Sequence, residues 1–187
     1  MTTSRPSGPL LPAVHEPAVM RCGHYVAEEI PGHEALVLRH LVTDLNAIEI
    51  AAAVNAMPGR RNAERLTPTV VRRSLHSLQE RLRASTREQM VDVACRAKIL
   101  LPPRTEPARP LPKTPLAHFQ LRAQGWTSQE IAGYFGVTPA TVTTYLADIR
   151  HRAGTRGNPA AVFRLHGVPG ALDGSPNCPI CASKGAA

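Results

Sequence analysis

The chain has 187 residues, of which 43% are hydrophobic and only 4% aromatic, so any core must be built mainly from aliphatic side chains and alanine, as in helical bundles. Its formal net charge of +8 favours a polyanionic partner, because neutralising phosphates supplies most non-specific affinity for nucleic acid. A signal peptide and a membrane-spanning stretch are both excluded by the absence of long apolar runs, so we expect a cytoplasmic protein with no membrane partner and no structural disulfides.

Residues 1–18 are rich in Pro, Ser and Gly and lack periodicity, which predicts a flexible tail. A first helical domain is expected over residues 19–100. Its longest helix should begin at Thr67-Pro68, because Thr caps helix N-termini and Pro is tolerated at the first helical position. The buried face of that helix is predicted from apolar residues at positions i, i+4, i+7 and i+11: Val71, Leu75, Leu78 and Leu82.

Residues 101–113 contain prolines at a density that prevents helix and sheet, so an extended, semi-rigid linker is expected there. A second helical domain follows over residues 114–168. Residues 169–187 are again rich in Gly and Pro and are expected to form a tail.

The second domain contains two clear helix starts. Thr127 with Glu130 three residues later forms a capping box, and Thr138 precedes Pro139 at the start of the next helix. Gly136 allows only a tight turn between these helices. The apolar residues that should pack the two helices together are Ile131, Ala132 and Phe135 on the first, and Val142, Leu146, Ile149 and Ala153 on the second.

The two domains are related by an internal repeat. Adding 81 carries Glu49-Ile-Ala onto Glu130-Ile-Ala, and adding 71 carries Thr67-Pro onto Thr138-Pro. The change in offset predicts ten extra residues between the second and third helices of the first copy, within residues 55–66.

The order Glu-Ile-Ala, Gly-Val-Thr, Ala-Thr-Val, Ala-Gly-Thr-Arg and Ala-Val-Phe-Arg-Leu closely resembles the LuxR/GerE-type DNA-binding domain over about residues 111–168. One departure is the first helix, where the family's Thr-x-x-Glu is replaced by a segment without Glu. The first copy also looks LuxR-like, apart from its elongated turn. The resemblance implies an all-α fold of two four-helix helix-turn-helix domains, and a sequence-specific transcriptional regulator that binds double-stranded DNA.

In the LuxR/GerE family, the residues that contact bases lie just after the Thr-Val pair of the third helix and one turn further on. The resemblance implies the same role for the matching positions of each copy. They fall on Arg72, Arg73 and His76 in the first copy and on Thr143, Thr144 and Ala147 in the second. Because arginine can donate two hydrogen bonds to guanine, we expect more direct readout from the first copy. Phosphate contacts are expected from Thr67, Thr69, Arg81, Thr138, Thr141, Arg150 and Arg156.

The expected partner and the expected assembly each have one alternative. The alternative to DNA binding is a protein-interaction module that docks on RNA polymerase or another regulator. The fourth helices carry apolar strips that we expect to pair within one chain, as an intramolecular pseudo-dimer that binds an asymmetric site. The alternative is that they pair between two chains, as a homodimer on a palindromic site. These strips are Met90, Val91 and Ala94 in the first copy and Ala161, Val162 and Leu165 in the second.

No phosphate loop, paired-carboxylate motif or nucleophile elbow is found, so no enzymatic activity is expected. The pairs Cys22-Gly-His24 and Cys178-Pro-Ile-Cys181 could together supply a Cys₃His set for one structural zinc ion. The alternative is that these are unligated thiols in flexible tails. Cys95 lies within a predicted helix and is expected to be packed.

Overall fold

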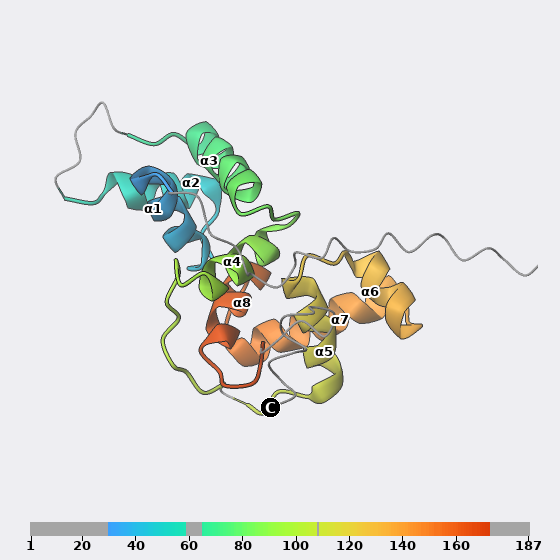
Figure 1. Ribbon diagram of the computed structural model, residues 1–187. Helices are drawn as coiled ribbons and strands as arrows, with labels where there is room; N and C mark the ends of the chain where they lie inside the picture. The colour runs from blue at the N-terminus through green and yellow to red at the C-terminus, as the bar shows by residue number, and fades with distance from the viewer. Residues whose placement is uncertain (1–29, 59–64, 108, 173–187) are drawn as a thin grey trace, which may run out of the picture.

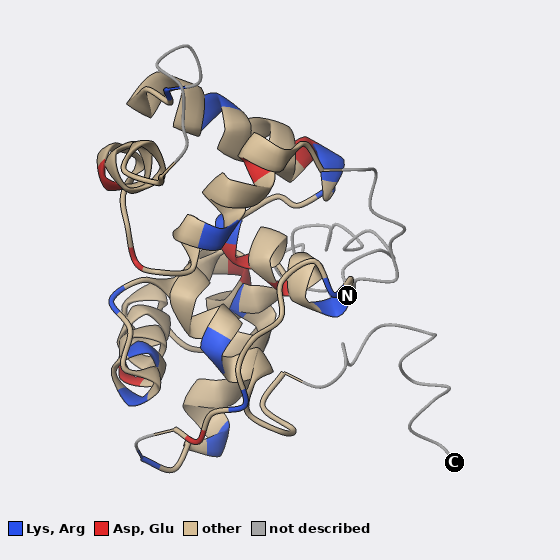
Figure 2. Ribbon diagram, turned by 90° about the vertical axis from the view of Figure 1, so that its left-hand side faces the viewer, with Lys and Arg blue, Asp and Glu red and all other residues tan. Residues whose placement is uncertain are grey.

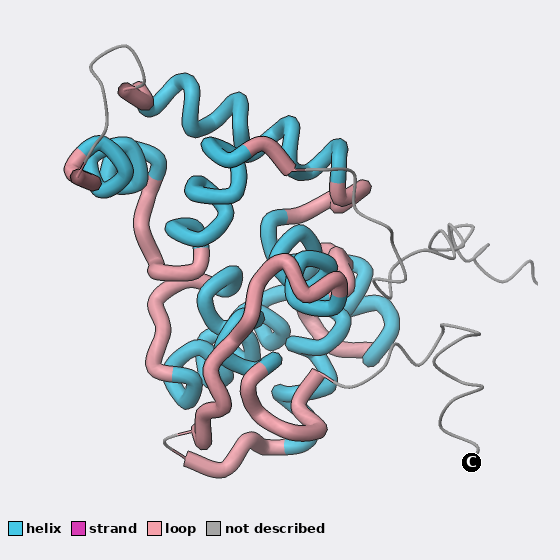
Figure 3. The backbone as a smooth tube through the Cα atoms, turned by 60° about the vertical axis from the view of Figure 1, so that its left-hand side comes forward, coloured by secondary structure: helices cyan, strands magenta, loops and turns pink. Residues whose placement is uncertain are grey.

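A computed structural model describes residues 30–58, 65–107 and 109–172 of this chain (Figure 1). Every regular element in these ranges is a helix, and none is a strand (Figure 3). None of the helices in the described part combines the length and the apolar composition needed to span a bilayer. Because every regular element in the described ranges is a helix, the predicted all-α class is confirmed.

The first half of the described chain, residues 30–100, contains four helices. They are α1 (Gly32–Leu41), α2 (Ala47–Asn55), α3 (Pro68–Arg81) and α4 (Arg87–Arg96). The second half, residues 109–172, contains another four. They are α5 (Lys113–Ala123), α6 (Ser128–Phe135), α7 (Pro139–Ala153) and α8 (Asn158–His166).

The helix starts follow the offsets of the sequence repeat. α5 and α6 begin 81 residues after α1 and α2, since 113 less 32 and 128 less 47 are both 81. α7 and α8 begin 71 residues after α3 and α4, since 139 less 68 and 158 less 87 are both 71. The extra length lies mainly between α2 and α3, where residues 56–67 form the connection, whereas residues 136–138 suffice between α6 and α7.

Local signals account for these starts. Thr67 and Thr138 accept hydrogen bonds from the backbone N–H three residues on, and Pro follows each of them at the first helical position. Thr127 and Glu130 form the predicted capping box. Gly136 ends α6 with φ at 66°, a left-handed conformation that glycine adopts without steric cost. The predicted caps and the tight turn are confirmed.

In the first half α1 and α2 pack on α3, in the second half α5, α6 and α8 pack on α7, and the two halves meet mainly through α4. α4 lies mainly against α8 and α5, with only a small contact to α3 of its own half. In Figure 1, α1 to α3 lie above the α4–α8 contact, and α5 to α7 lie to its right, with α5 and α7 reaching below it. Both apolar strips of the fourth helices, around Met90 and Ala161, are buried. The cores of the two halves are consequently continuous.

One residue departs from its predicted packing. Phe135 was expected to join the stripe between α6 and α7, but 36% of it is exposed and its ring stacks on His118 of α5, with 4.0 Å between ring centroids. The helical periodicity placed Phe135 on the correct side of α6. It could not show that a histidine of α5 would lie against the last turn of α6.

The predicted linker and tail contact the end of α8. The backbone N–H of Thr105 donates to the carbonyl of Gly167, and a side chain at Gly167 would collide with the carbonyl of Pro103. Ala171 and Leu172, which the sequence placed in a tail from residue 169, are buried in the core. The folded second half therefore extends at least to Leu172.

Cys95 is buried in α4, as expected. Burial, reinforced by the carboxylate of Asp92, raises the pKa of its thiol from 9.0 to about 12. Above pH 9 the unfolded chain can therefore release this proton while the folded chain retains it. Folding stability due to Cys95 is fully present below pH 9 and is lost as pH rises from about 9 towards 12.

The measurement is the free energy of unfolding of the wild type and of Cys95→Ala from neutral pH to above pH 9. The difference between them should be constant below pH 9 and should then shift in favour of the alanine variant. Taking the difference removes the contributions of other groups that titrate in the same range. A constant difference at every pH would contradict the raised pKa of Cys95.

Candidate nucleic-acid interface

The outer face of α3 carries the predicted base-contacting residues of the first half. Arg72, Arg73 and His76 are exposed, whereas Val71 and Leu75, on the opposite side of the helix, are buried. The imidazole of His76 lies 3.4 Å from the carboxylate of Glu80 one turn on, and both side chains are exposed. The α3 face therefore presents two guanidinium groups to solvent on a rigid, well-packed helix.

The equivalent face of α7 has a different chemistry. Thr143 and Thr144 are exposed, and their hydroxyls donate to the carbonyls of Pro139 and Ala140 one turn earlier, at 3.0 and 3.1 Å. Because each hydroxyl hydrogen is used within the helix, each side chain offers solvent an oxygen acceptor and a methyl group. Ala147, one turn further on, is half-buried. This face can accept hydrogen bonds and make apolar contacts.

The residues predicted to contact phosphate surround these two faces. Thr67 and Thr138 are exposed at the N-termini of α3 and α7, where unpaired backbone N–H groups favour anions. The hydroxyl of Thr138 lies 2.9 Å from that of Thr141, which is half-buried. Three further members of the set also remain accessible: Thr69 and Arg156 are exposed and Arg150 is half-buried.

Arg81 has a partner that the sequence did not reveal. Its Nε lies 3.4 Å from the carboxylate of Glu34, which is buried in α1. This ion pair joins the end of α3 to α1 and turns the guanidinium towards the protein. The structure thus gives Arg81 a role in packing, and it is the weakest member of the predicted phosphate-binding set.

No family model, curated protein or solved structure matches this chain. The candidate interface therefore rests on the geometry of the chain itself.

The contact between the two halves includes a helix cap that sequence reasoning missed. Asp44, between α1 and α2, accepts hydrogen bonds from the backbone N–H groups of Arg156 and Gly157, at 2.9 and 2.7 Å. These groups stand at the start of α8, and Gly157 has no side chain with which to cap the helix itself. A carboxylate is favoured there by the helix dipole. The first half thus completes a helix of the second half.

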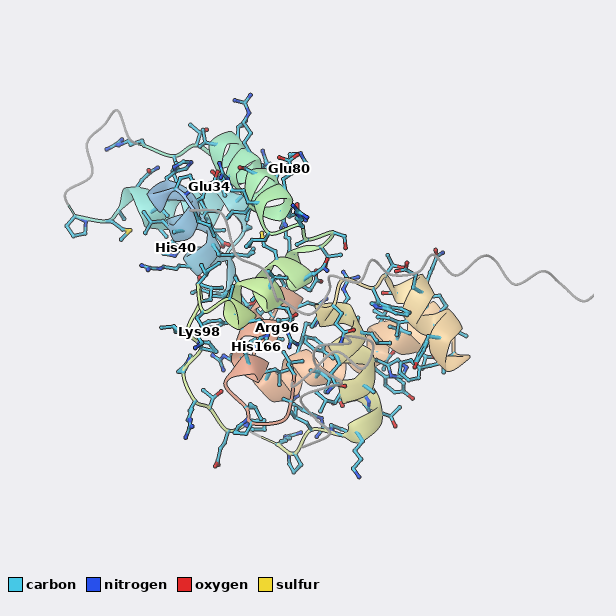
Figure 4. All side chains as sticks on the ribbon, viewed as in Figure 1. Glu34, His40, Glu80, Arg96, Lys98 and His166 are labelled. Atoms are coloured by element: carbon cyan, nitrogen blue, oxygen red, sulfur yellow. The ribbon has the colours of Figure 1, made fainter. Side chains whose placement is uncertain are left out.

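Buried charges lie where α4 meets the second half, and Figure 2 shows acidic and basic segments at the middle of the molecule. Asp92 of α4 is fully buried and accepts hydrogen bonds from Arg96 at 2.9 Å and from His166 of α8 at 2.8 Å. Figure 4 shows Arg96 and His166 close together at this contact. Glu88, also on α4, pairs with Arg122 of α5 at 2.9 Å. These directional contacts fix how α4 sits on the second half.

An aromatic cluster of the second half also went unpredicted. Its rings form a chain from Trp126 through Tyr134 and Phe135 to His118, and on to Tyr145. His118 is buried, and its Nδ1 donates to the carbonyl of Thr114. Tyr134 is 63% exposed, so this cluster presents aromatic surface to solvent.

The four residues predicted to bind zinc, Cys22, His24, Cys178 and Cys181, lie outside the described residues. The zinc site stays a prediction from the sequence.

Proposed function

We propose that this protein binds double-stranded DNA through the outer faces of α3 and α7 and regulates transcription. Each face would belong to a four-helix, LuxR-like helix-turn-helix domain, with α3 and α7 as the helices that enter the major groove. The observation that carries this proposal is the equivalence of the two helices. Both start at a Thr-Pro cap at matching repeat positions, bury one apolar stripe and expose the opposite polar face.

The outer faces of α3 and α7 would recognise different bases. Arg72 and Arg73 can each donate paired hydrogen bonds to guanine O6 and N7. Thr143 and Thr144 can accept a hydrogen bond from an amino group of adenine or cytosine, or place a methyl group against that of thymine. Thr67, Thr138, Arg150 and the other members of the phosphate-binding set would fix the position of the protein on the duplex.

The second candidate function is docking on a protein such as RNA polymerase or another regulator. It is favoured by the exposed aromatic surface of Tyr134 and Phe135 on α6. Large apolar side chains left exposed beside one another often mark protein contacts.

Salt dependence distinguishes the two functions. If about six phosphates are neutralised, the affinity of the whole chain for a short duplex should fall about 10³-fold between roughly 50 and 200 mM salt, because bound counterions are released on association. Docking through aromatic side chains should change little over the same range. Tyr134→Ser serves as the control and should leave duplex affinity unchanged. No duplex binding, or affinity that does not fall with salt, would contradict the proposed function.

A further inference from the structure

One kind of contact between the two halves, that of a helix connection with a helix start, is reciprocal. Asp44, in the connection between α1 and α2, touches the start of α8 at Arg156 and Gly157. Adding 81 to 44 gives Gly125, in the connection between α5 and α6, and its carbonyl lies 3.5 Å from the hydroxyl of Ser85, just before α4. Ser85 is itself the repeat equivalent of Arg156, since 156 less 85 is 71. Each half therefore places the same connection against the same helix start of the other half.

The backbone at these two connections is also alike. Asp44 and Gly125 both have positive φ, 62° and 92°. A side chain at Gly125 would lie 2.5 Å from the amide oxygen of Gln89 and 2.8 Å from the hydroxyl of Ser85. Close approach explains glycine at this position, whereas a carboxylate occupies the equivalent position at Asp44. The two contacts thus share a place in the fold and differ in chemistry.

Reciprocal contacts of this kind identify the symmetry. When patch x of one unit touches patch y of the other and y touches x in return, the units are related by a two-fold axis, whereas a head-to-tail arrangement repeats only one of the two contacts. The packing of α4 on α8 agrees, because these are equivalent helices of the two halves. The additional contact of α4 with α5 has no comparable counterpart between α8 and α1, so the two-fold relation is approximate. Buried pairs such as Asp92–His166 hold this arrangement in one register.

We infer that one chain is a complete two-fold DNA reader, which binds as a monomer to an inverted pair of unlike half-sites. This inference rests on the proposed function. The inversion follows from the two-fold relation between α3 and α7. The difference between the half-sites follows from their outer faces, which carry Arg72 and Arg73 on one helix and Thr143 and Thr144 on the other. The half-site read by α3 is richer in guanine, and the half-site read by α7 presents thymine methyl groups or amino donors.

The test begins with selection of bound duplexes from random DNA by the full-length chain, followed by the mass of the complex on the selected duplex. One chain should be bound per duplex, and the two half-sites should be inverted and unlike. Inserting about five base pairs, half a helical turn, between them should lower affinity by about 100-fold or more, because a fixed junction cannot follow half-sites that rotate to opposite faces of the DNA.

Matched variants assign the half-sites. In the double variant Arg72→Ala with Arg73→Ala, base changes in the guanine-rich half-site should no longer alter affinity, whereas base changes in the other half-site should still lower it. The double variant Thr143→Ala with Thr144→Ala should show the opposite pattern. Two chains per duplex, a palindromic selected site, or affinity that tolerates the five-base-pair insertion would overturn this inference while leaving DNA binding intact. Failure to bind any duplex would overturn both it and the proposed function.

Discussion

Asp92→Ala should lower the free energy of unfolding by about 3–5 kcal/mol, the loss expected when one partner is removed from a buried charge pair. Asp92 is fully buried and holds both Arg96 and His166 at the contact between α4 and α8. Without the carboxylate, the guanidinium of Arg96 would remain largely buried with its charge uncompensated. Urea denaturation followed by far-UV circular dichroism measures the change.

Asp148→Ala is the matched control. Asp148 and Arg152 form a pair of the same i, i+4 spacing and the same 2.9 Å distance, but both side chains are partly exposed. Asp148→Ala should lower the free energy of unfolding by less than about 1 kcal/mol, because solvent screens the pair and hydrates the remaining arginine. Asp92→Asn should fall between the two alanine variants, since the amide keeps an oxygen acceptor. Equal losses for Asp92→Ala and Asp148→Ala would contradict the role given to Asp92.

Arg72→Ala should cost about 1–3 kcal/mol of binding free energy on the preferred duplex and should relax the preference at one base position. Arg72 is exposed on the outer face of α3, where its guanidinium can reach paired acceptors on guanine. Binding to random DNA should fall much less, because only one phosphate-attracting charge is lost. Equilibrium binding to the selected duplex, to single-base variants of it and to random duplex measures both effects.

Two arginines serve as controls for this result. Arg150→Ala should weaken binding to all sequences about equally, as expected of a phosphate contact. Arg39→Ala removes an exposed positive charge from α1, a helix that carries none of the predicted DNA contacts, and should change affinity little. If Arg72→Ala weakened binding to preferred and random duplexes equally, the assignment of Arg72 to base readout would be wrong.

Local patterns in the sequence determined the number, type and starting points of most helices. The Thr127 capping box and the Thr-Pro starts at Thr67 and Thr138 are formed by residues three or four positions apart, so the structure repeats what the sequence already contained. The repeat offsets are likewise a property of the chain alone. The positions of Arg72 and Thr143 on exposed faces follow from helical periodicity once the buried stripes are recognised.

Only the tertiary structure decided how the halves join and which charged residues face inward. Asp44 caps a helix that begins more than a hundred residues later, Asp92 meets His166 across two helices, and Arg81 turns to Glu34. The periodicity of the sequence does not identify these residues. A polar side chain on a helix or in a turn is predicted to be solvent-exposed, and only the tertiary structure shows that another element covers it. The strength of a local cap is determined within one turn of helix, whereas the environment of a charge depends on what the fold brings against it from elsewhere in the chain.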